Sequence, residues 1–253
     1  MGEGSGAIDG EGTPDLSVVV PAYNERGCIA ASLAAMSAYL DSLALDYEII
    51  VVCDGSQDGT EQIVAALACQ HCRLRLISYP CNRGKGFAVR TGITAARGRF
   101  VMFFDADLTV PITIVPQFLA ALRDGYDIAI ASRRHPASSA LALLPRRRQV
   151  MGQVFSWFVR RLVIDDLGDT QCGGKAYRAE VARCLFGRQR IDHFSFDAEV
   201  LYLARRLNCR IKEVPFVIQH APSGSSIQPV RDSLVMLRDL LRIRLYALRG
   251  RYE

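Results

Sequence analysis

The stretch Arg99-Phe-Val-Met-Phe-Phe-Asp-Ala-Asp107 decides the fold of this chain. Five apolar residues run directly into two carboxylates, which is the pattern of a buried strand that ends in a polar loop. In an extended chain Asp105 and Asp107 share a face, because side chains alternate with a period of two. Two carboxylates at a strand end offer the oxygen ligands that Mg²⁺ or Mn²⁺ prefers. Two aspartates in an ordinary turn are the alternative.

The sequence around this stretch alternates short apolar runs with longer amphipathic ones. The apolar runs predict strands at residues 16–20, 47–53, 73–79, 99–104 and 127–131. The amphipathic runs predict helices at residues 25–40, 58–69, 85–96 and 114–122. This alternation predicts an α/β fold with a mixed, mainly parallel sheet and helices on both faces. In such sheets ligands bind beyond the carboxyl ends of the strands.

The second half is less regular. A basic loop is predicted at 132–148, helices at 150–164, 196–207 and 230–248, and a strand at 210–218. We therefore divide the chain into a loose tail at 1–14, a domain at 15–226 and a C-terminal amphipathic basic helix at 227–253. Within the domain we separate a regular half at residues 15–131 from a less regular half at residues 132–226.

Composition excludes several classes of protein. With 253 residues, 50% hydrophobic and 23% charged, the chain has enough apolar residues for a sizeable core and is not a disordered sequence. No apolar run approaches the roughly 18–20 residues that a membrane-spanning helix needs. The tail lacks the pattern of a signal peptide. Of the eight cysteines, Cys69 and Cys72 have CxxC spacing without a second pair, which favours structural thiols.

Charge is distributed unevenly along the chain. Residues 1–130 hold 9 Lys and Arg against 15 Asp and Glu, a net −6, whereas residues 131–253 hold 22 against 11, a net +11. An acidic front half and a basic back half suggest a metal site and an anionic partner, respectively. Because 28 of the 31 basic residues are Arg, phosphate is a favoured partner, although a G+C-rich genome would also enrich Arg.

Four motifs in order resemble one known family. They are Val19-Val-Pro-Ala-Tyr-Asn-Glu25, Asp54-Gly-Ser-Gln-Asp-Gly-Thr60, Asn82-Arg-Gly-Lys-Gly86 and Asp105-Ala-Asp107. Together they resemble the family 2 glycosyltransferases of the GT-A fold. Farther on, Asp169-Thr-Gln-Cys-Gly173, Lys175 and Phe196-Asp-Ala-Glu199 are similar to the branch that includes dolichyl-phosphate β-glucosyltransferases and dolichol-phosphate mannose synthases. The resemblance covers roughly residues 16–226. It implies that residues 15–131 hold the nucleotide sugar and that residues 132–226 hold the acceptor.

The resemblance implies an inverting, metal-dependent transfer of a hexose from a nucleotide sugar, with UDP-glucose favoured over GDP-mannose. The residues that it implies for the base and ribose are Pro21, Tyr23, Glu25 and Asp54. Lys85 would help to close the nucleotide pocket. Asp107 would bind the Mg²⁺ or Mn²⁺ that bridges the diphosphate, and Asp105 would contact the ribose or the metal.

The acceptor is expected to be a polyprenyl phosphate. A phosphate is ionised near neutral pH and needs cations to position it, whereas a hydroxyl acceptor needs a general base. By resemblance, Arg133 and Arg148 would hold that phosphate, with Gln171 also at the acceptor. Asp197 occupies the place of the catalytic base in relatives with sugar acceptors, and with a phosphate acceptor it would orient groups.

The chain departs from the family pattern at two places. Gly174 stands where many relatives of this branch have a bulky aromatic residue, and Gln219-His220 stands where a Trp is often found. Both departures leave the identity of the acceptor open. His220 is either a metal ligand, as late histidines are in some GT-A enzymes, or a structural residue.

The last predicted helix has a leucine stripe beside an arginine stripe. The leucines are Leu234, Leu237, Leu241, Leu245 and Leu248, and the arginines are Arg231, Arg238, Arg242 and Arg249. This pattern suits a helix lying on an anionic bilayer, as expected for a peripheral protein on the cytoplasmic face of a membrane. A helix packed on the domain or in a homodimer is the alternative.

Other functions remain as alternatives. A glycosyltransferase with a lipid or small-molecule hydroxyl acceptor would keep the same donor site, and a nucleotide-sugar sensor would bind without turnover. The Asp105 and Asp107 pair beside Arg133 and Arg148 favours turnover. The basic back half by itself suggests nucleic-acid binding, but the sequence has no recognisable module for it, so no nucleic-acid partner is expected.

Overall fold

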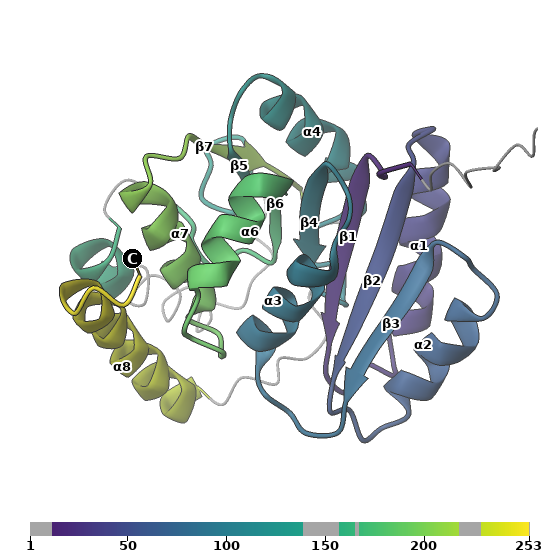
Figure 1. Ribbon diagram of the computed structural model, residues 1–253, viewed down its shortest axis with the longest axis horizontal. Helices are drawn as coiled ribbons and strands as arrows, with labels where there is room; N and C mark the ends of the chain where they lie inside the picture. The colour runs from purple at the N-terminus through teal and green to yellow at the C-terminus, as the bar shows by residue number, and fades with distance from the viewer. Residues whose placement is uncertain (1–11, 139–156, 165–166, 218–228, 253) are drawn as a thin grey trace, which may run out of the picture.

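The computed structural model describes residues 12–138, 157–164, 167–217 and 229–252. Seven strands form one sheet in the order β3-β2-β1-β4-β6-β5-β7 (Figure 1). The strands are β1 (Leu16–Ala22), β2 (Tyr47–Asp54), β3 (Leu74–Tyr79), β4 (Phe100–Phe104), β5 (Ile128–Ser132), β6 (Gly174–Arg178) and β7 (Ile211–Pro215). All neighbouring strands are parallel except at β6, which runs antiparallel to β4 and β5. The sheet is therefore mixed and mainly parallel, as predicted.

Helices cover both faces of this sheet. One face packs against α1 (Ile29–Ser42), α2 (Thr60–Ala68), the short η1 (Ile112–Ile114) and α4 (Val115–Arg123). The other face packs against α3 (Lys85–Ala95), α6 (Ala179–Arg188) and α7 (Phe196–Arg206). The last helix, α8 (Pro229–Leu248), lies beside α7 at the end of the molecule (Figure 1).

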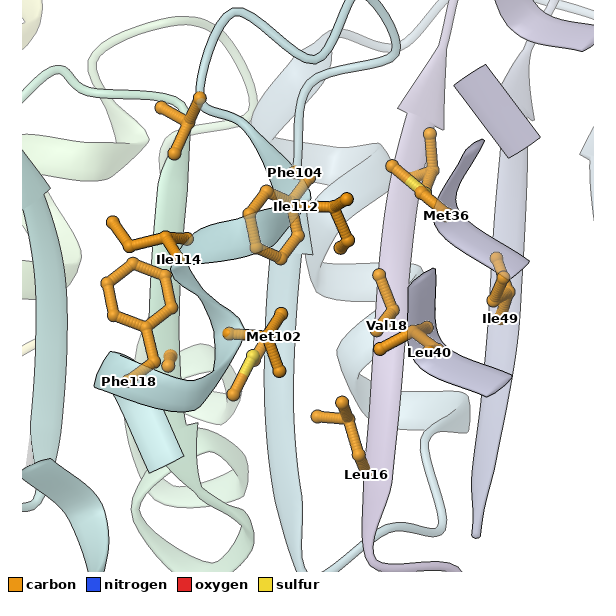
Figure 2. Packing of buried hydrophobic residues seen from close by; sticks show 14 of the residues in the cluster. Leu16, Val18, Met36, Leu40, Ile49, Met102, Phe104, Ile112, Ile114 and Phe118 are labelled. Carbon is orange, nitrogen blue, oxygen red and sulfur yellow. The ribbon is translucent and has the colours of Figure 1, made fainter. Parts of the chain in front are cut away.

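The strands are buried on both faces, which explains their continuous apolar sequence. In β1, Val18 and Val20 belong to the core on the α1 side, whereas Val19 between them belongs to the core on the α3 side. Figure 2 shows the first of these cores, where Phe104 lies close to Phe118 of α4. Strands without alternating polar residues are expected in the middle of such a sheet, and β1 and β4 lie there.

Two elements of the second half were not predicted. The strand β6 and the helix α6 directly follow Gly173, in a stretch that contains Gly174, Lys175 and Arg178. A short strand with a lysine in it does not match the apolar pattern of the other strands. It forms because β4 and β5 flank it on both sides and because Lys175 finds a buried partner.

The predicted helix boundaries need one correction. The first helix begins at Ile29 rather than Glu25, because residues 25–28 form a turn. In that turn the Cys28 and Ile29 amides both donate to the Glu25 carbonyl, at 3.1 and 2.9 Å. Glu25 is therefore placed in the loop that follows β1, at the carboxyl edge of the sheet.

Helix α8 buries one face and exposes another. Leu240 and Ile243 are fully buried against Val159, Ile191 and Ala198. In the described parts of the chain no helix is both long and apolar enough to cross a bilayer. The predicted packing of this helix on the domain is therefore confirmed for one face, and its exposed face is considered below.

Removing the Phe118 side chain tests the core shown in Figure 2. We expect Phe118→Ala to lower the free energy of unfolding by about 3–5 kcal/mol, because a fully buried ring leaves a cavity. Val217→Ala, at a side chain that is 58% exposed, should change it by less than about 0.5 kcal/mol. Urea unfolding followed by circular dichroism measures both, and equal effects would contradict the core assignment.

Candidate active site

Three loops with polar side chains meet at one edge of the sheet. They follow β1, β2 and β4, and each of these strands is parallel to its neighbour, with Ala22 paired to Cys53 and Val19 to Phe103. The carboxyl ends of the three strands therefore lie next to one another. This edge carries Glu25, Asp54 and the two aspartates after β4.

Lys85 joins the β4 loop to the start of α3. Its Nζ lies 2.6 Å from Asp105 Oδ1. Burial alone would lower the pKa of Lys85, but the carboxylates of Asp105 and Asp197 outweigh that effect and raise it. The Lys85 side chain is therefore held as a cation beside Asp105.

The close approach of a neighbouring loop also fixes Asp105. The Asp105 amide donates to the Gly173 carbonyl at 3.2 Å, and a Cβ at Gly173 would overlap the Asp105 carboxylate. A glycine is therefore required where the loop before β6 passes the end of β4.

Asp107 has partners within its own loop. Its two carboxylate oxygens accept hydrogen bonds from the Thr109 amide at 2.9 Å and the Thr109 hydroxyl at 2.7 Å. Across the site, burial raises the pKa of Glu25, the Cys28 thiol opposes this by donating to Glu25, and the charges of Asp107 and Asp105 add to the rise. Glu25 therefore lies close enough to Asp105 and Asp107 for their charges to affect its pKa, and its role in a shared site stays a prediction.

The Asp54 carboxylate accepts hydrogen bonds from the turn that precedes α3. One carboxylate oxygen accepts from the Arg83 amide at 2.7 Å, and the other accepts from the Gly84 amide at 2.9 Å and Asn82 Nδ2 at 3.0 Å. The side chain is only 3% exposed. Asp54 was predicted to hold the base or ribose, and the structure shows it holding the 82–84 turn that presents Lys85.

Asp197 is buried at the start of α7 and forms an ion pair with Lys175. Lys175 Nζ lies 2.7 Å from Asp197 Oδ1 and also donates to the Cys172 carbonyl at 2.6 Å. Neither side chain is more than 5% exposed. Burial raises the pKa of Asp197, and the ammonium groups of Lys175 and Lys85 oppose that rise. A carboxylate already bound by a buried lysine is better suited to orientation than to proton removal.

Arg133 is bound by Asp169. Its Nε and Nη2 donate to the two Asp169 oxygens at 2.7 and 2.8 Å, and its amide donates to Oδ2 at 3.1 Å. Burial would lower the pKa of Arg133, but the Asp169 charge raises it, and Arg133 in turn lowers the pKa of Asp169. Gln171 lies in the same loop, with its amide donating to Asp169 Oδ1 at 3.2 Å and its buried Nε2 without a partner in the described structure.

The remaining predicted residues fall into two groups. Pro21 is buried near the end of β1, and Tyr23 follows it with 44% of its surface exposed. Arg148 and His220 lie outside the described residues. Their predicted roles, like those of the other site residues, remain predictions.

The carboxylates of the β4 loop fit a divalent metal in type. Oxygen donors suit Mg²⁺ and Mn²⁺, and within the described residues the Asp107 carboxylate accepts hydrogen bonds from Thr109, which a metal would replace. Among the residues that the structure describes, no group of three or more His, Cys, Asp or Glu forms a metal cage. Two aspartates therefore leave most of a metal's coordination to other oxygens, such as those of a diphosphate and water.

Comparison with known proteins places the chain in a family. The model of glycosyl transferase family 2 matches residues 17–186. A dolichyl-phosphate beta-glucosyltransferase from Dictyostelium discoideum is 35% identical over 247 residues, covering 93% of this chain and 75% of that protein. Its Homo sapiens counterpart is 34% identical over 255 residues, covering 95% and 78%. The chain belongs to glycosyl transferase family 2.

Solved structures agree on the fold. Glucosyl-3-phosphoglycerate synthase from Mycobacterium tuberculosis, solved with Mn²⁺, UDP and phosphoglyceric acid, superposes with a TM-score of 0.65. The two are 23% identical, and the match covers 92% of this chain and 78% of that one. The GT-A fold expected from the sequence is thereby confirmed.

Two charged partners were not identified from the sequence. Lys175 and Asp169 stood in a recognised motif without a stated role, and the structure pairs them with Asp197 and Arg133. A lysine beside the apolar pair Ala176-Tyr177, in the pentapeptide Gly174-Lys-Ala-Tyr-Arg178, was the available signal, because a buried lysine requires a buried anion.

The buried ion pair gives a test of stability. We expect Lys175→Met to lower the free energy of unfolding by about 3–5 kcal/mol, because it leaves Asp197 buried without its cation. Adding Asp197→Asn to Lys175→Met should recover part of this loss, since the amide carries no charge. Urea unfolding of the three proteins decides, and a double variant no more stable than Lys175→Met would contradict the pairing.

Proposed function

We propose that this protein is an inverting glycosyltransferase that moves glucose from UDP-glucose to a polyprenyl phosphate. The observation that carries the proposal is the carboxyl-edge site, where Asp105 forms an ion pair with the cation Lys85 and where Asp107 and Glu25 add carboxylates from the loops after β4 and β1. The relatives named dolichyl-phosphate beta-glucosyltransferase support glucose as the sugar and a lipid phosphate as the acceptor.

The donor would occupy the edge formed by the β1, β2 and β4 loops. Pro21, Tyr23 and Glu25 would contact the base and ribose, with Tyr23 exposed enough to stack on a base. Asp54 would act through the turn that it holds. Lys85 would exchange part of its contact with Asp105 for a diphosphate oxygen, so that the charge of the leaving nucleotide is met by a cation already in place.

A divalent cation, Mg²⁺ or Mn²⁺, would be held by Asp107 and Asp105. Bound there, it would stabilise the negative charge that develops on the departing nucleotide diphosphate. The i, i+2 spacing after β4 and the acidic surroundings of Glu25 support this role. The solved relative with Mn²⁺ and UDP supports it as well.

The acceptor phosphate would lie on the basic side of the site. Arg133, with 29% of its side chain exposed, has guanidinium hydrogens left after pairing with Asp169. Arg148 and the unpartnered Gln171 Nε2 would supply further donors. Asp197 would orient Lys85 and its neighbours rather than remove a proton, because an ionised phosphate needs no general base.

A transfer assay tests both reaction and metal. Purified protein with UDP-glucose, Mn²⁺ or Mg²⁺ and a polyprenyl phosphate in detergent should form a glucosylated lipid, measured by thin-layer chromatography. Excess EDTA should abolish product, and Asp107→Asn should lower kcat/KM by at least about a thousandfold, from the loss of several kcal/mol of transition-state stabilisation.

The matched control for that variant is Asp124→Asn, an exposed aspartate at the end of α4. Its activity should equal that of the wild type. Full turnover in EDTA would remove the metal from the proposal. Transfer from GDP-mannose but not from UDP-glucose would overturn the proposed donor.

We also infer that α8 attaches the protein to an anionic bilayer. Opposite its buried face, Leu241, Leu245 and Leu248 are 55%, 40% and 85% exposed. The exposed arginines beside them are Arg238, Arg242, Arg244 and Arg249. Between residues 235 and 252 the only acid is Asp239, which is buried. A second copy of this face would oppose arginine to arginine, whereas anionic lipid complements it.

Vesicle sedimentation tests the attachment. Full-length protein should pellet with phosphatidylserine vesicles at low salt and release near 1 M salt, where the Debye length falls to roughly 3 Å. Leu241→Ser, Leu245→Ser and Leu248→Ser combined should abolish pelleting, because the apolar contact is lost while Leu240 and Ile243 still pack. Leu207→Ser, at an exposed leucine after α7, is the control. Unchanged pelleting of the triple variant would contradict the role of this face.

A further inference from the structure

The turn that contains Tyr252 is hydrogen-bonded to a buried residue of α7. Tyr252 is 5% exposed, and its hydroxyl donates a 2.6 Å hydrogen bond to Glu199 Oε1. Arg188 Nε donates to the Tyr252 carbonyl at 3.1 Å. Tyr252, four residues beyond the end of α8 at Leu248, is thus held at both its side chain and its backbone.

Glu199 connects this turn to the segment between α6 and α7. It is fully buried in the first turn of α7. Its Oε2 accepts from the Arg190 and Ile191 amides at 3.0 and 2.8 Å. Burial raises the pKa of Glu199, and the donors from Tyr252, Ile191 and Arg190 oppose that rise. The carboxylate therefore depends on these donors to remain ionised in the core.

The other side of the same segment holds the start of α3. The Phe87 amide donates to the Asp192 carbonyl at 3.0 Å, and Gln189 Nε2 donates to the Gly86 carbonyl at 3.0 Å. Arg90 Nη2 forms a 2.6 Å ion pair with Asp192 Oδ1. Gly84, at φ +105°, lies so close that a Cβ would be 2.5 Å from the Asp192 carbonyl oxygen. Segment 189–193 therefore packs against the turn that precedes Lys85 and restrains it.

These contacts form a continuous path from the chain's end to the site. Tyr252 holds Glu199, Glu199 holds the 190–191 amides, and the 189–193 segment holds Gly86 and Phe87 in the first turn of α3. Lys85, between Gly84 and Gly86, then reaches Asp105. No residue of this path between Tyr252 and Gly86 is among those proposed to touch substrate.

We propose that Tyr252 and Glu199 are positioning residues that set the nucleotide-binding turn at 82–85 through the 189–193 segment. The inference rests on the proposed function in that Lys85 and this turn bind the nucleotide. When the Tyr252 hydroxyl is absent, Glu199 loses a donor and holds the 190–191 amides less firmly. The turn then spends less time in its binding arrangement, and the apparent nucleotide affinity falls by that fraction. Because Tyr252 follows α8 by four residues, the same contacts connect the helix that we propose to bind lipid with the proposed donor site.

Calorimetry with UDP and Mn²⁺ tests the inference on full-length protein. Tyr252→Phe should weaken UDP binding by about tenfold and raise KM for UDP-glucose while leaving kcat within twofold, because the loss affects ground state and transition state alike. Tyr246→Phe is the matched control. Its ring packs on Tyr252 at 6.2 Å, and its hydroxyl makes no hydrogen bond to another described residue. That variant should bind UDP as the wild type does.

Hydrogen exchange gives a second readout that a general loss of stability would not reproduce. In Tyr252→Phe, exchange should rise selectively at the Arg190, Ile191 and Phe87 amides and not at the β1 amides. If Tyr252→Phe does not fold, Asp192→Asn serves instead, because it weakens the Arg90 pair on the same path and should also weaken UDP binding.

The outcomes separate the two proposals. Wild-type protein that fails to bind UDP would overturn the proposed donor. Wild-type protein that binds UDP, together with folded Tyr252→Phe or Asp192→Asn variants that bind it within twofold as well, would overturn the positioning role alone.

Discussion

Carboxylates at the end of a sheet that is buried on both faces must be matched by cations or hydrogen-bond donors, because an unpaired buried charge is costly. Four carboxylates in and around this site meet that constraint with a group distant in sequence, whereas Asp107 is met by Thr109 within its own loop. Asp105 is met by Lys85, Asp197 by Lys175, and Asp169 by Arg133. Asp54 is met by the backbone of the 82–84 turn. These pairs join the β4 loop, the α3 start, β6 and α7 into one frame, so the charges of the site also determine how its loops are held.

The same pairing would suit the nucleotide that we propose for this site. A nucleotide diphosphate would bring more negative charge to an edge that is already acidic, and only cations placed there in advance, or a metal, would offset it without a large rearrangement. Lys85 is held in place by Asp105 and by the segment between α6 and α7, and its ionised state is favoured by three acids. A preorganised cation of this kind stabilises a leaving group more effectively than one that must move, which is consistent with membership of a glycosyltransferase family.

Helix α8 has one face packed on the domain and another face exposed to solvent. Its buried residues Leu240 and Ile243 pack on the domain, and its exposed leucines and arginines face outward. The sequence pattern offered packing and surface attachment as alternatives, whereas the structure shows that packing uses Leu240 and Ile243 and leaves Leu241, Leu245 and Leu248 exposed. Attachment to the domain through Tyr252 and Glu199 means that the outward face has a fixed orientation relative to α7.

The sequence by itself determined the alternation of strands and helices and the position of Asp54, Asp105 and Asp107 at strand ends, because buried strands are continuously apolar and polar residues mark where they stop. It also determined the family, through four motifs in order. Only the tertiary structure decided which charges are paired. The fold inserts β6 between β4 and β5. It also buries Lys175 against Asp197, 22 positions away, and pairs Arg133 with Asp169, 36 positions away. Local pattern carries no information about such pairs, because a buried charge is tolerated only through the partner that the completed fold brings to it.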